Sequence, residues 1–201
     1  MHPSSLFHES DEAVLLAHLG QYPLATLVAA PQGRLLVAQA PVVVRRLGEG
    51  LALDFHLSRG NDLTAFIAEG FQAVAVSLAA EAYISPDWYE DADQVPTWNY
   101  ISVEAEGPVR ALDEDGLVAL LDGLSAQEEA KLAPKPPWTR HKMSAGRFEG
   151  MTRAILGARM TVERLEGTTK LSQNKNAADR AGVAAALGDH PIARRMRDAA
   201  P

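Results

Sequence analysis

The chain has 201 residues, of which 47% are hydrophobic, 22% charged and 6% aromatic, a profile of globular rather than disordered or fibrous proteins. It contains no cysteine, which excludes disulfides, thiolate metal sites, iron–sulfur clusters and cysteine nucleophiles. The N-terminus lacks the basic and apolar regions of a signal peptide, and no apolar run approaches the roughly 20 residues that span a bilayer. We therefore expect a cytoplasmic protein that does not cross a membrane.

The formal net charge of −7 argues against a dedicated nucleic-acid binder. The charge is uneven, because residues 1–130 carry 5 basic and 20 acidic side chains whereas residues 131–201 carry 14 and 6. A basic last third fits an anion site or an acidic partner, and it also fits two parts of one domain that complement each other. We favour the second interpretation for most of these charges.

The first half of the chain is expected to form a helix and then a series of short antiparallel strands. Ser10 is the expected N-cap of the helix, which Gly20 and Pro23 end. Asn61 is expected to cap a short helix that stops at Gly70. Turns rich in glycine separate the intervening valine- and leucine-rich runs. The expected strands are 24–29, 35–38, 42–46, 51–57, 71–78 and 83–84.

The second half of the chain mixes strands with more helices. An acidic loop at 85–96 leads into a strand, and a capping box from Ser125 to Glu128 is expected to open a new helix. Three prolines make 133–138 an irregular linker. The expected strands here are 97–106 and 159–165, and the expected helices are 113–124, 148–156, 176–187 and a basic tail helix near Arg194, Arg195 and Arg197.

This order of elements predicts a mainly β, α+β protein, namely a closed antiparallel barrel with peripheral helices. Short strands leave edges open to pairing unless the sheet closes or the chain dimerises. The sequence holds no dinucleotide or phosphate-loop glycine motif, no hydrolase elbow and no zinc helix, and its six histidines lack metal-ligand spacing. We therefore predict no metal site and identify no catalytic residue.

One candidate binding segment runs from Phe55 to Leu63, where a strand passes through polar residues into a helix start. His56, Ser58, Arg59 and Asn61 lie in this turn. A hydroxyl, a guanidinium, free amides and a glycine that permits close approach are the groups that bind phosphate. An ordinary capped turn, with Arg59 in solvent and His56 at the edge of the core, explains the same residues about equally well.

A second candidate is the strand start with Thr97, Trp98, Asn99 and Tyr100. Two aromatic residues at period two share a face, and the neighbouring amide and hydroxyl can bond the heteroatoms of a flat ring. An aromatic stripe of this kind is more often simply core. Here the polar neighbours favour a ring-binding strand.

A third candidate is the polar segment 167–180, which contains Lys170, Gln173 and Asn174. Amides and lysines between a strand and a helix suit an anion or the edge of a ring. A helix-entry loop capped by Asn176 is an equal alternative.

Taken together, these segments resemble the PaiB-type family of FMN-binding negative transcriptional regulators. The tyrosine-isoleucine-serine-proline string at 83–86 and the proline-threonine-tryptophan-asparagine-tyrosine string at 96–100 are the most specific matches. The matching stretches occur in order along nearly the whole chain, at 23–28, 55–61, 82–89, 95–100 and 170–174 with 178–180.

The resemblance implies a six-stranded antiparallel split β-barrel of the FMN-binding type, a homodimer, and FMN at the dimer interface. We expect one such domain over 1–201, with a helical insertion at about 113–157 and C-terminal helices at about 174–199. His56, Ser58, Arg59 and Asn61 would hold the FMN phosphate. The flavin would be lined by Thr97, Trp98, Asn99 and Tyr100, and Lys170, Gln173 and Asn174 would close the pocket, from either subunit.

These expectations lead to one main functional hypothesis and one alternative. The main hypothesis is an FMN-binding, PaiB-like transcriptional regulator that acts through a flavin or metabolite site at the dimer interface. The alternative is a flavin-dependent oxidoreductase that reduces a small molecule with NAD(P)H, in which the flavin carries the chemistry. We do not expect direct DNA binding, because the sequence shows no helix-turn-helix and is mostly acidic.

Overall fold

We describe the fold from a computed structural model of the chain. It describes residues 2–91 and 93–198, so position 92 of the acidic loop and position 199 of the expected C-terminal helices lie outside the described residues. The strands are β1 (His8–Glu9), β2 (Leu24–Ala29), β3 (Leu36–Pro41), β4 (Val43–Leu47), β5 (Gly50–Ser58), β6 (Phe71–Ile84), β7 (Thr97–Ala111), β8 (Ile155–Thr161) and β9 (Arg164–Lys170). The α-helices are α1 (Glu12–Gln21), α2 (Glu114–Ala130), α3 (Arg147–Thr152), α4 (Ala177–Leu187) and α5 (Pro191–Asp198).

All strands belong to one antiparallel sheet, in the order β3-β2-β6-β7-β8-β5-β4, with β9 paired to β7 and β1. The prediction of a mainly β protein with peripheral helices is confirmed, but the sheet has nine strands among the described residues instead of six. The predicted closure is wrong, because the end strands β3 and β4 form no pair in the described part of the chain. Only Val42 separates β3 from β4 in the chain, yet the two strands lie at opposite ends of the strand order, so the chain turns a corner there. The Val42 N–H donates to Pro23 O at 2.8 Å.

The barrel end of the sheet encloses the larger apolar core. Its centre is filled by Leu27, Leu53, Phe55, Val103 and Met160, each at most 2% exposed. Burial of a side chain of this size contributes roughly 1.5–3 kcal/mol. This core fixes the strands from which the candidate residues extend.

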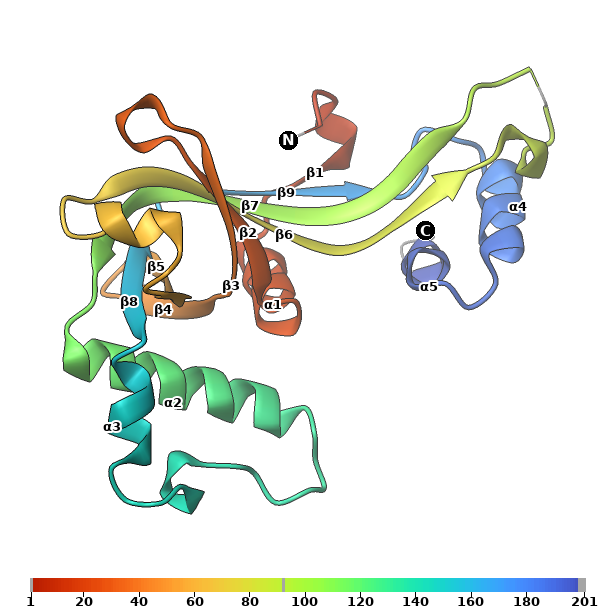
Figure 1. Ribbon diagram of the computed structural model, residues 1–201. Helices are drawn as coiled ribbons and strands as arrows, with labels where there is room; N and C mark the ends of the chain where they lie inside the picture. The colour runs from red at the N-terminus through yellow and green to blue at the C-terminus, as the bar shows by residue number, and fades with distance from the viewer. Residues whose placement is uncertain (1, 92, 199–201) are drawn as a thin grey trace.

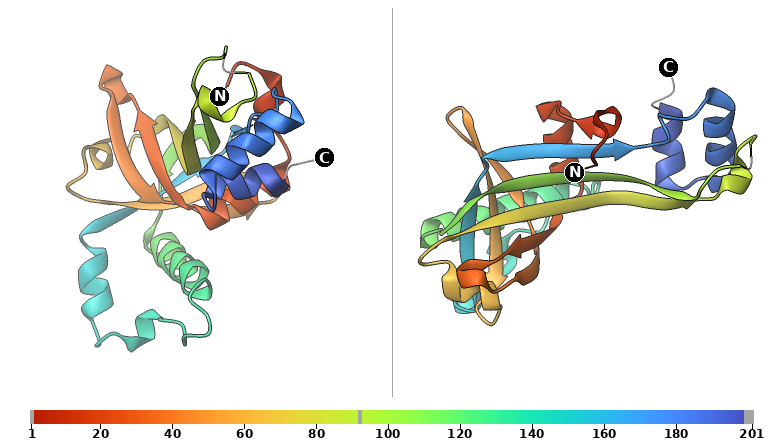
Figure 2. Two further views of the ribbon diagram at one scale, coloured as in Figure 1. Left: turned by 90° about the vertical axis from the view of Figure 1, so that its right-hand side faces the viewer. Right: turned by 90° about the horizontal axis from the view of Figure 1, so that it is seen from above.

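Beyond the barrel, β6 and β7 continue as a long ribbon, with β9 alongside β7, and its far end lies against α4 and α5 (Figures 1 and 2). A second apolar core lies there, with Ile84, Ile101, Leu171 and Ile192 among its members. The sequence predicted two separate strands, 71–78 and 83–84, where the structure has one. A register shift between Leu78 and Ala80 explains the difference, because the extra residue moves the buried side chains from odd to even positions and disguises the alternation.

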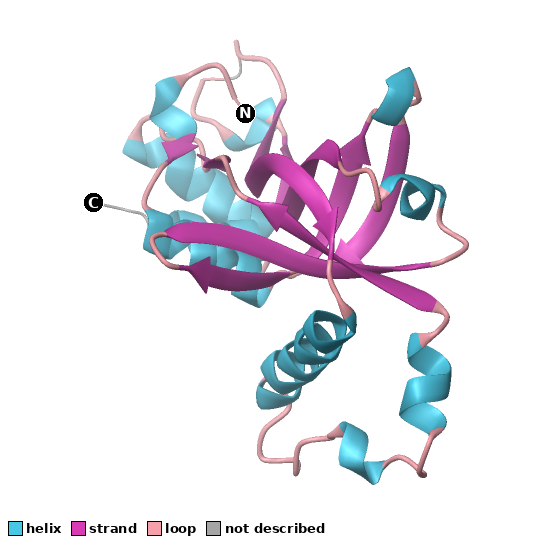
Figure 3. Ribbon diagram, turned by 90° about the vertical axis from the view of Figure 1, so that its left-hand side faces the viewer, coloured by secondary structure: helices cyan, strands magenta, loops and turns pink. Residues whose placement is uncertain are grey.

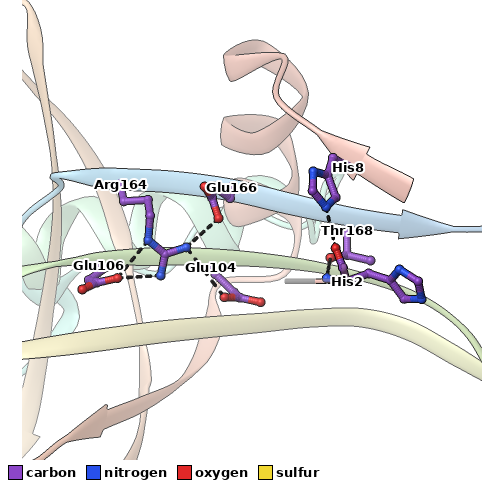
Figure 4. Close-up of polar contacts among 7 residues, drawn as sticks. All are labelled: His2, His8, Glu104, Glu106, Arg164, Glu166 and Thr168. Atoms are coloured by element: carbon purple, nitrogen blue, oxygen red, sulfur yellow. Dashed lines mark hydrogen bonds and ion pairs between the residues drawn. The ribbon is translucent and has the colours of Figure 1, made fainter. Parts of the chain in front are cut away.

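The predicted strand 159–165 is in fact two strands, β8 and β9, joined by a reversal at 162–163. The reversal lies against β7, where a Cβ on Gly107 would come within 1.8 Å of Thr161 O. On β9, Arg164 contacts three carboxylates and Thr168 accepts from the His2 N–H at 3.4 Å (Figure 4). The carboxylates belong to Glu104, Glu106 and Glu166.

The helices differ from prediction mainly at their ends. Asp11, not Ser10, caps α1, because its carboxylate accepts from two backbone N–H groups of the first turn. The predicted new helix at Ser125 is wrong, since α2 runs through it without a break and packs on the barrel through fully buried Leu120. The predicted helix 148–156 is shorter, because Ile155 already belongs to β8. Together α2 and α3 project from the barrel (Figure 3), and no helix in the described ranges is long and apolar enough to cross a membrane.

Candidate functional site

The turn after β5 has the predicted Asn61 cap, but the amides that were expected to be free are bonded within the turn. The Gly60 N–H donates to Ser58 Oγ at 3.3 Å, and the Asn61 N–H donates to Ser58 O at 2.8 Å. Asn61 Oδ1 accepts from the Leu63 N–H at 3.0 Å, which makes Asn61 the N-cap. The helix that follows, Asp62–Phe66, is a single 3-10 turn, so its dipole adds little to anion binding.

Arg59 supplies the positive charge of this turn. Its Nε donates to Arg153 O at 2.7 Å, which anchors the guanidinium, while its terminal nitrogens contact no acceptor in the described ranges. A cavity of about 460 Å³ lies beside it, lined also by Gly60, Asn61 and Arg34. Arg34 is already paired with Asp62, with Nη2 at 2.5 Å from Oδ2, so Arg59 is the cation that can bind an oxyanion here. The turn therefore presents one guanidinium end that is unpaired among the described residues, whereas the Gly60 and Asn61 N–H groups are already bonded to Ser58.

The structure turns His56 away from this cavity. His56 lies on the outward face of β5 with Asp54, and it lines a different cavity, between α2 and α3. Its Nδ1 is buried and has no hydrogen-bond partner among the described residues. Burial lowers the pKa of His56, so the imidazole is neutral near pH 7.

The start of β7 has two different faces. Trp98 is 51% exposed, and its ring meets that of Tyr83 edge-to-face at 6.0 Å. Asn99 is fully buried on the opposite face, where its Nδ2 donates to Ser172 Oγ at 2.9 Å. Asn99 therefore holds the loop after β9 in place and does not lie beside Trp98, where the sequence interpretation placed it as a ring donor. Tyr100 shares the side of Trp98 by alternation.

The segment after β9 comes to the same end of the ribbon. Lys170 Nζ donates to Thr97 Oγ1 at 2.7 Å, and burial lowers the pKa of this lysine. Gln173 is occupied within its own loop, because its Nε2 donates to Thr169 O at 2.5 Å. Asn174 is exposed. The structure thus brings the second and third candidate segments together.

The phosphate turn lies far from these two segments within one chain. Through β8, Phe55 aligns with Ala111 at one end of β7, and Tyr100 lies eleven positions along the same strand. At about 3.3 Å per residue, that is roughly 35 Å of strand. One chain therefore does not bring Arg59 and Trp98 to one ligand.

Sequence reasoning missed two residues that the structure places at these sites. Tyr83 lies opposite Trp98 in the β6–β7 register, and Arg34 reaches the turn cavity from the β2–β3 connection. Tyr83 begins the string at 83–86 that carries the family resemblance, but the bulge between Leu78 and Ala80 sets its face. No sequence signal points to Arg34.

The fold, an antiparallel sheet rolled into a split barrel that is not closed among the described residues, is the fold of split-barrel proteins, which include flavin-binding ones. The FAD and haem binding protein from Mycobacterium smegmatis has this fold with a TM-score of 0.57 and 19% identity, over 91% of this chain and 81% of its own. The flavocytochrome Anf3 from Azotobacter vinelandii has a TM-score of 0.55 and 16% identity, over 90% and 78%.

The particular family follows from sequence. The family described as "Putative FMN-binding domain" matches residues 1–164, so this chain belongs to that FMN-binding family, and FMN is its cofactor. The "Protease synthase and sporulation protein PAI 2" of Bacillus subtilis is 27% identical over 175 residues, which cover 86% of this chain and 83% of that protein. The resemblance to the PaiB type is therefore confirmed.

Proposed function

We propose that two copies of this chain bind FMN between them, with the phosphate on the Ser58–Asn61 turn of one copy and the flavin ring on the Trp98–Tyr100 ribbon of the other. The observation that carries the proposal is the separation of these segments within one chain. A twofold dimer can bring each turn to the partner's ribbon and forms two equivalent sites.

The outward face of the sheet supports such a dimer. By alternation, large apolar side chains on β2, β3, β6 and β7 share this face and are exposed. They are Leu24, Val37, Leu78, Tyr83 and Trp98, each between 48% and 62% exposed. Large apolar side chains left exposed on one face are typical of an interface. β3 also ends the strand order and leaves an edge that a second copy would cover.

In this arrangement each residue has a defined task. Arg59 binds the phosphate, and Gly60 leaves room for its close approach, while Trp98, Tyr100 and Tyr83 flank the ring and exclude water. Lys170, at the end of β9, lies at the same end of the ribbon, where it bonds Thr97. The bound FMN supplies electron-transfer chemistry. The barrel, the helical insertion and the C-terminal helices then serve as one domain, because both cores are built on the same β6–β7 ribbon.

We further propose that the protein regulates transcription indirectly, through the flavin site and a partner or metabolite. The resemblance to the PaiB-type regulators, together with the likeness to a protein named for protease synthase and sporulation, supports this proposal. The basic tail is poorly placed to grip DNA, because Arg194 Nε donates to Asp189 O at 3.1 Å and Arg197 Nη2 donates to Gly188 O at 3.0 Å. Both side chains stabilise the C-terminal end of α4.

Complementation between two variants tests the shared site. The protein is first purified without added cofactor, its visible spectrum is recorded, and its mass in solution is measured. We expect a yellow dimer in which Arg59→Ala or Trp98→Ala each weakens FMN binding by roughly ten- to a hundred-fold. Arg46→Ala, which removes an exposed arginine paired with Glu12, is the matched control and should bind as the wild type does.

Mixing the two variants gives the decisive result. In a random mixture half of the dimers carry one copy of each variant, and each of these has one intact site, so about a quarter of all sites should bind normally. No recovery, in a mixture shown to exchange subunits, overturns the shared site. A colourless protein that does not bind added FMN overturns flavin binding itself. Steady oxidation of NADH or NADPH by the yellow protein would favour the oxidoreductase alternative.

A further inference from the structure

A second cavity lies on the outer side of the barrel, between α2, α3 and the end of β5. Its volume is about 360 Å³, within the range of small-molecule sites. It does not include Arg59, Gly60 or Asn61 of the phosphate turn. Its lining includes His56, Asp122, Trp138, Arg140, Met143 and Phe148.

The lining of this cavity is mostly apolar and aromatic. Trp138 and Phe148 offer flat ring surfaces, and Met143 offers a polarisable side chain that adapts to an aromatic ring. Trp138 is 38% exposed, so its surface is open to an incoming molecule. This composition suits a planar ring better than a flexible polar chain.

The charges in the lining cancel each other. Arg140 Nε lies 3.1 Å from Asp122 Oδ1, and the guanidinium sits 5.1 Å from the centre of the Phe148 ring. Because the two charges of this pair neutralise each other, the lining offers a charged ligand no net counter-charge. The cavity therefore favours a neutral molecule.

His56 supplies the polar contact. The residue lines this cavity, and its Nδ1 is a buried atom without a hydrogen-bond partner among the described residues; Arg140 Nε, also buried and without a hydrogen bond there, is ion-paired with Asp122. Because Nδ1 is enclosed by protein, a ligand in the cavity would bond the other ring nitrogen, Nε2, for which the described residues offer no partner. The cavity adjoins the Arg59 turn along the chain, because its lining residue Thr152 precedes Arg153, whose carbonyl accepts from Arg59 Nε.

We propose that this cavity is a second ligand site, separate from the flavin site, for a neutral planar aromatic molecule of one or two rings that hydrogen-bonds to His56. The proposal goes beyond FMN binding and does not require it. Trp138 and Phe148 hold the ring, and His56 selects molecules that carry a hydrogen-bonding group.

Two probes of the same shape separate packing from hydrogen bonding. Benzimidazole carries a ring N–H donor and a ring nitrogen acceptor, so it suits either tautomer of His56, whereas indene has the same outline and neither group. Binding to the full chain is measured by calorimetry, with nitrogen-15 spectra that report the indole N–H groups of the three tryptophans. We expect benzimidazole to bind roughly three- to ten-fold more tightly than indene and to shift the Trp138 signal.

Variants assign this preference to His56. His56→Leu should bring benzimidazole down to the affinity of indene and leave indene unchanged. The matched control is His141→Leu, which removes an exposed histidine beside Arg140 that does not line the cavity, and it should change neither affinity. Circular dichroism of each variant checks that it folds.

Several outcomes would overturn the proposal. They are no binding of either probe, a shift at Trp88 or Trp98 instead of Trp138, and equal affinities of the two probes in the wild type. Displacement of benzimidazole by FMN would also overturn it, because the cavity would then belong to the flavin site. Failure of FMN binding with intact benzimidazole binding would refute only the function proposed above.

Discussion

Asp54 allows a test of what holds β4, β5 and β8 together on the side of the barrel that α2 covers. Its carboxylate is 2% exposed and accepts from two arginines on neighbouring strands. Arg159 bonds it twice, at 2.6 Å from Nε and 2.8 Å from Nη2, and Arg45 Nε lies at 3.2 Å. The carboxylate in turn raises the pKa of Arg159, mainly through these hydrogen bonds. Asp54 thereby joins β4, β5 and β8 under α2.

Asp54→Asn should lower the free energy of unfolding, because it removes the negative charge that pairs with both arginines. Removing one partner of a buried ion pair typically costs about 3–5 kcal/mol, because the remaining charge is left without compensation. The two arginine side chains are 30% and 31% exposed, so water can solvate part of their charge. We therefore expect a loss of about 3 kcal/mol in the free energy of unfolding, near the lower limit. For a chain of this length, that lowers Tm by roughly 6–12 °C.

Urea unfolding at pH 7, followed by circular dichroism, measures this loss. The matched control is Asp62→Asn, which removes one partner of the exposed Arg34–Asp62 pair, whose side chains are 64% and 59% exposed. Such exposed pairs contribute about 0–1 kcal/mol. If Asp54→Asn costs no more than Asp62→Asn, burial does not strengthen the Asp54 cluster and the reasoning fails.

Two further predictions concern pH and packing. Burial is the largest cause of the lowered pKa of His18, and the nearby Arg195 charge also lowers it. The unfolded chain therefore binds a proton at His18 more readily than the folded chain does. The free energy of unfolding should hold above about pH 6.5 and fall as the pH drops toward the folded pKa. Urea titrations from pH 7.5 to 5.5 check this, and a flat profile would contradict it. Gly107→Ala should destabilise the protein by at least about 1–3 kcal/mol, because its Cβ meets Thr161 O. Gly20→Ala, with no atom within 4 Å of its Cβ, should stabilise by up to about 1 kcal/mol, and calorimetric Tm values should show these opposite signs.

The sequence by itself determined features that depend on local chemistry. The caps at Asn61 and Asn176 follow from side chains that accept from backbone N–H groups two or three residues ahead. The irregular segment 133–138 follows from its prolines, and β2 has the predicted limits because glycine, proline and alternation bound it clearly. The motif strings were enough to identify the FMN-binding family.

Tertiary structure decided which side chains face each other. A single extra residue near Ala79 reverses the alternation of β6 and joins two apparent strands into one. Packing of Leu120 on the barrel keeps α2 intact through a sequence that would otherwise cap a new helix. Such effects depend on partners distant in the chain, which local patterns do not encode.

The same limit governs the candidate site. Sequence reasoning grouped Asn99 with Trp98, but the Ser172 contact holds Asn99 on the opposite face. It also grouped the turn at Arg59 with the ribbon at Trp98, because both have the right chemistry for one ligand. The pairing of β5, β8 and β7 separates them, since register, and not composition, sets how far apart two strand ends lie.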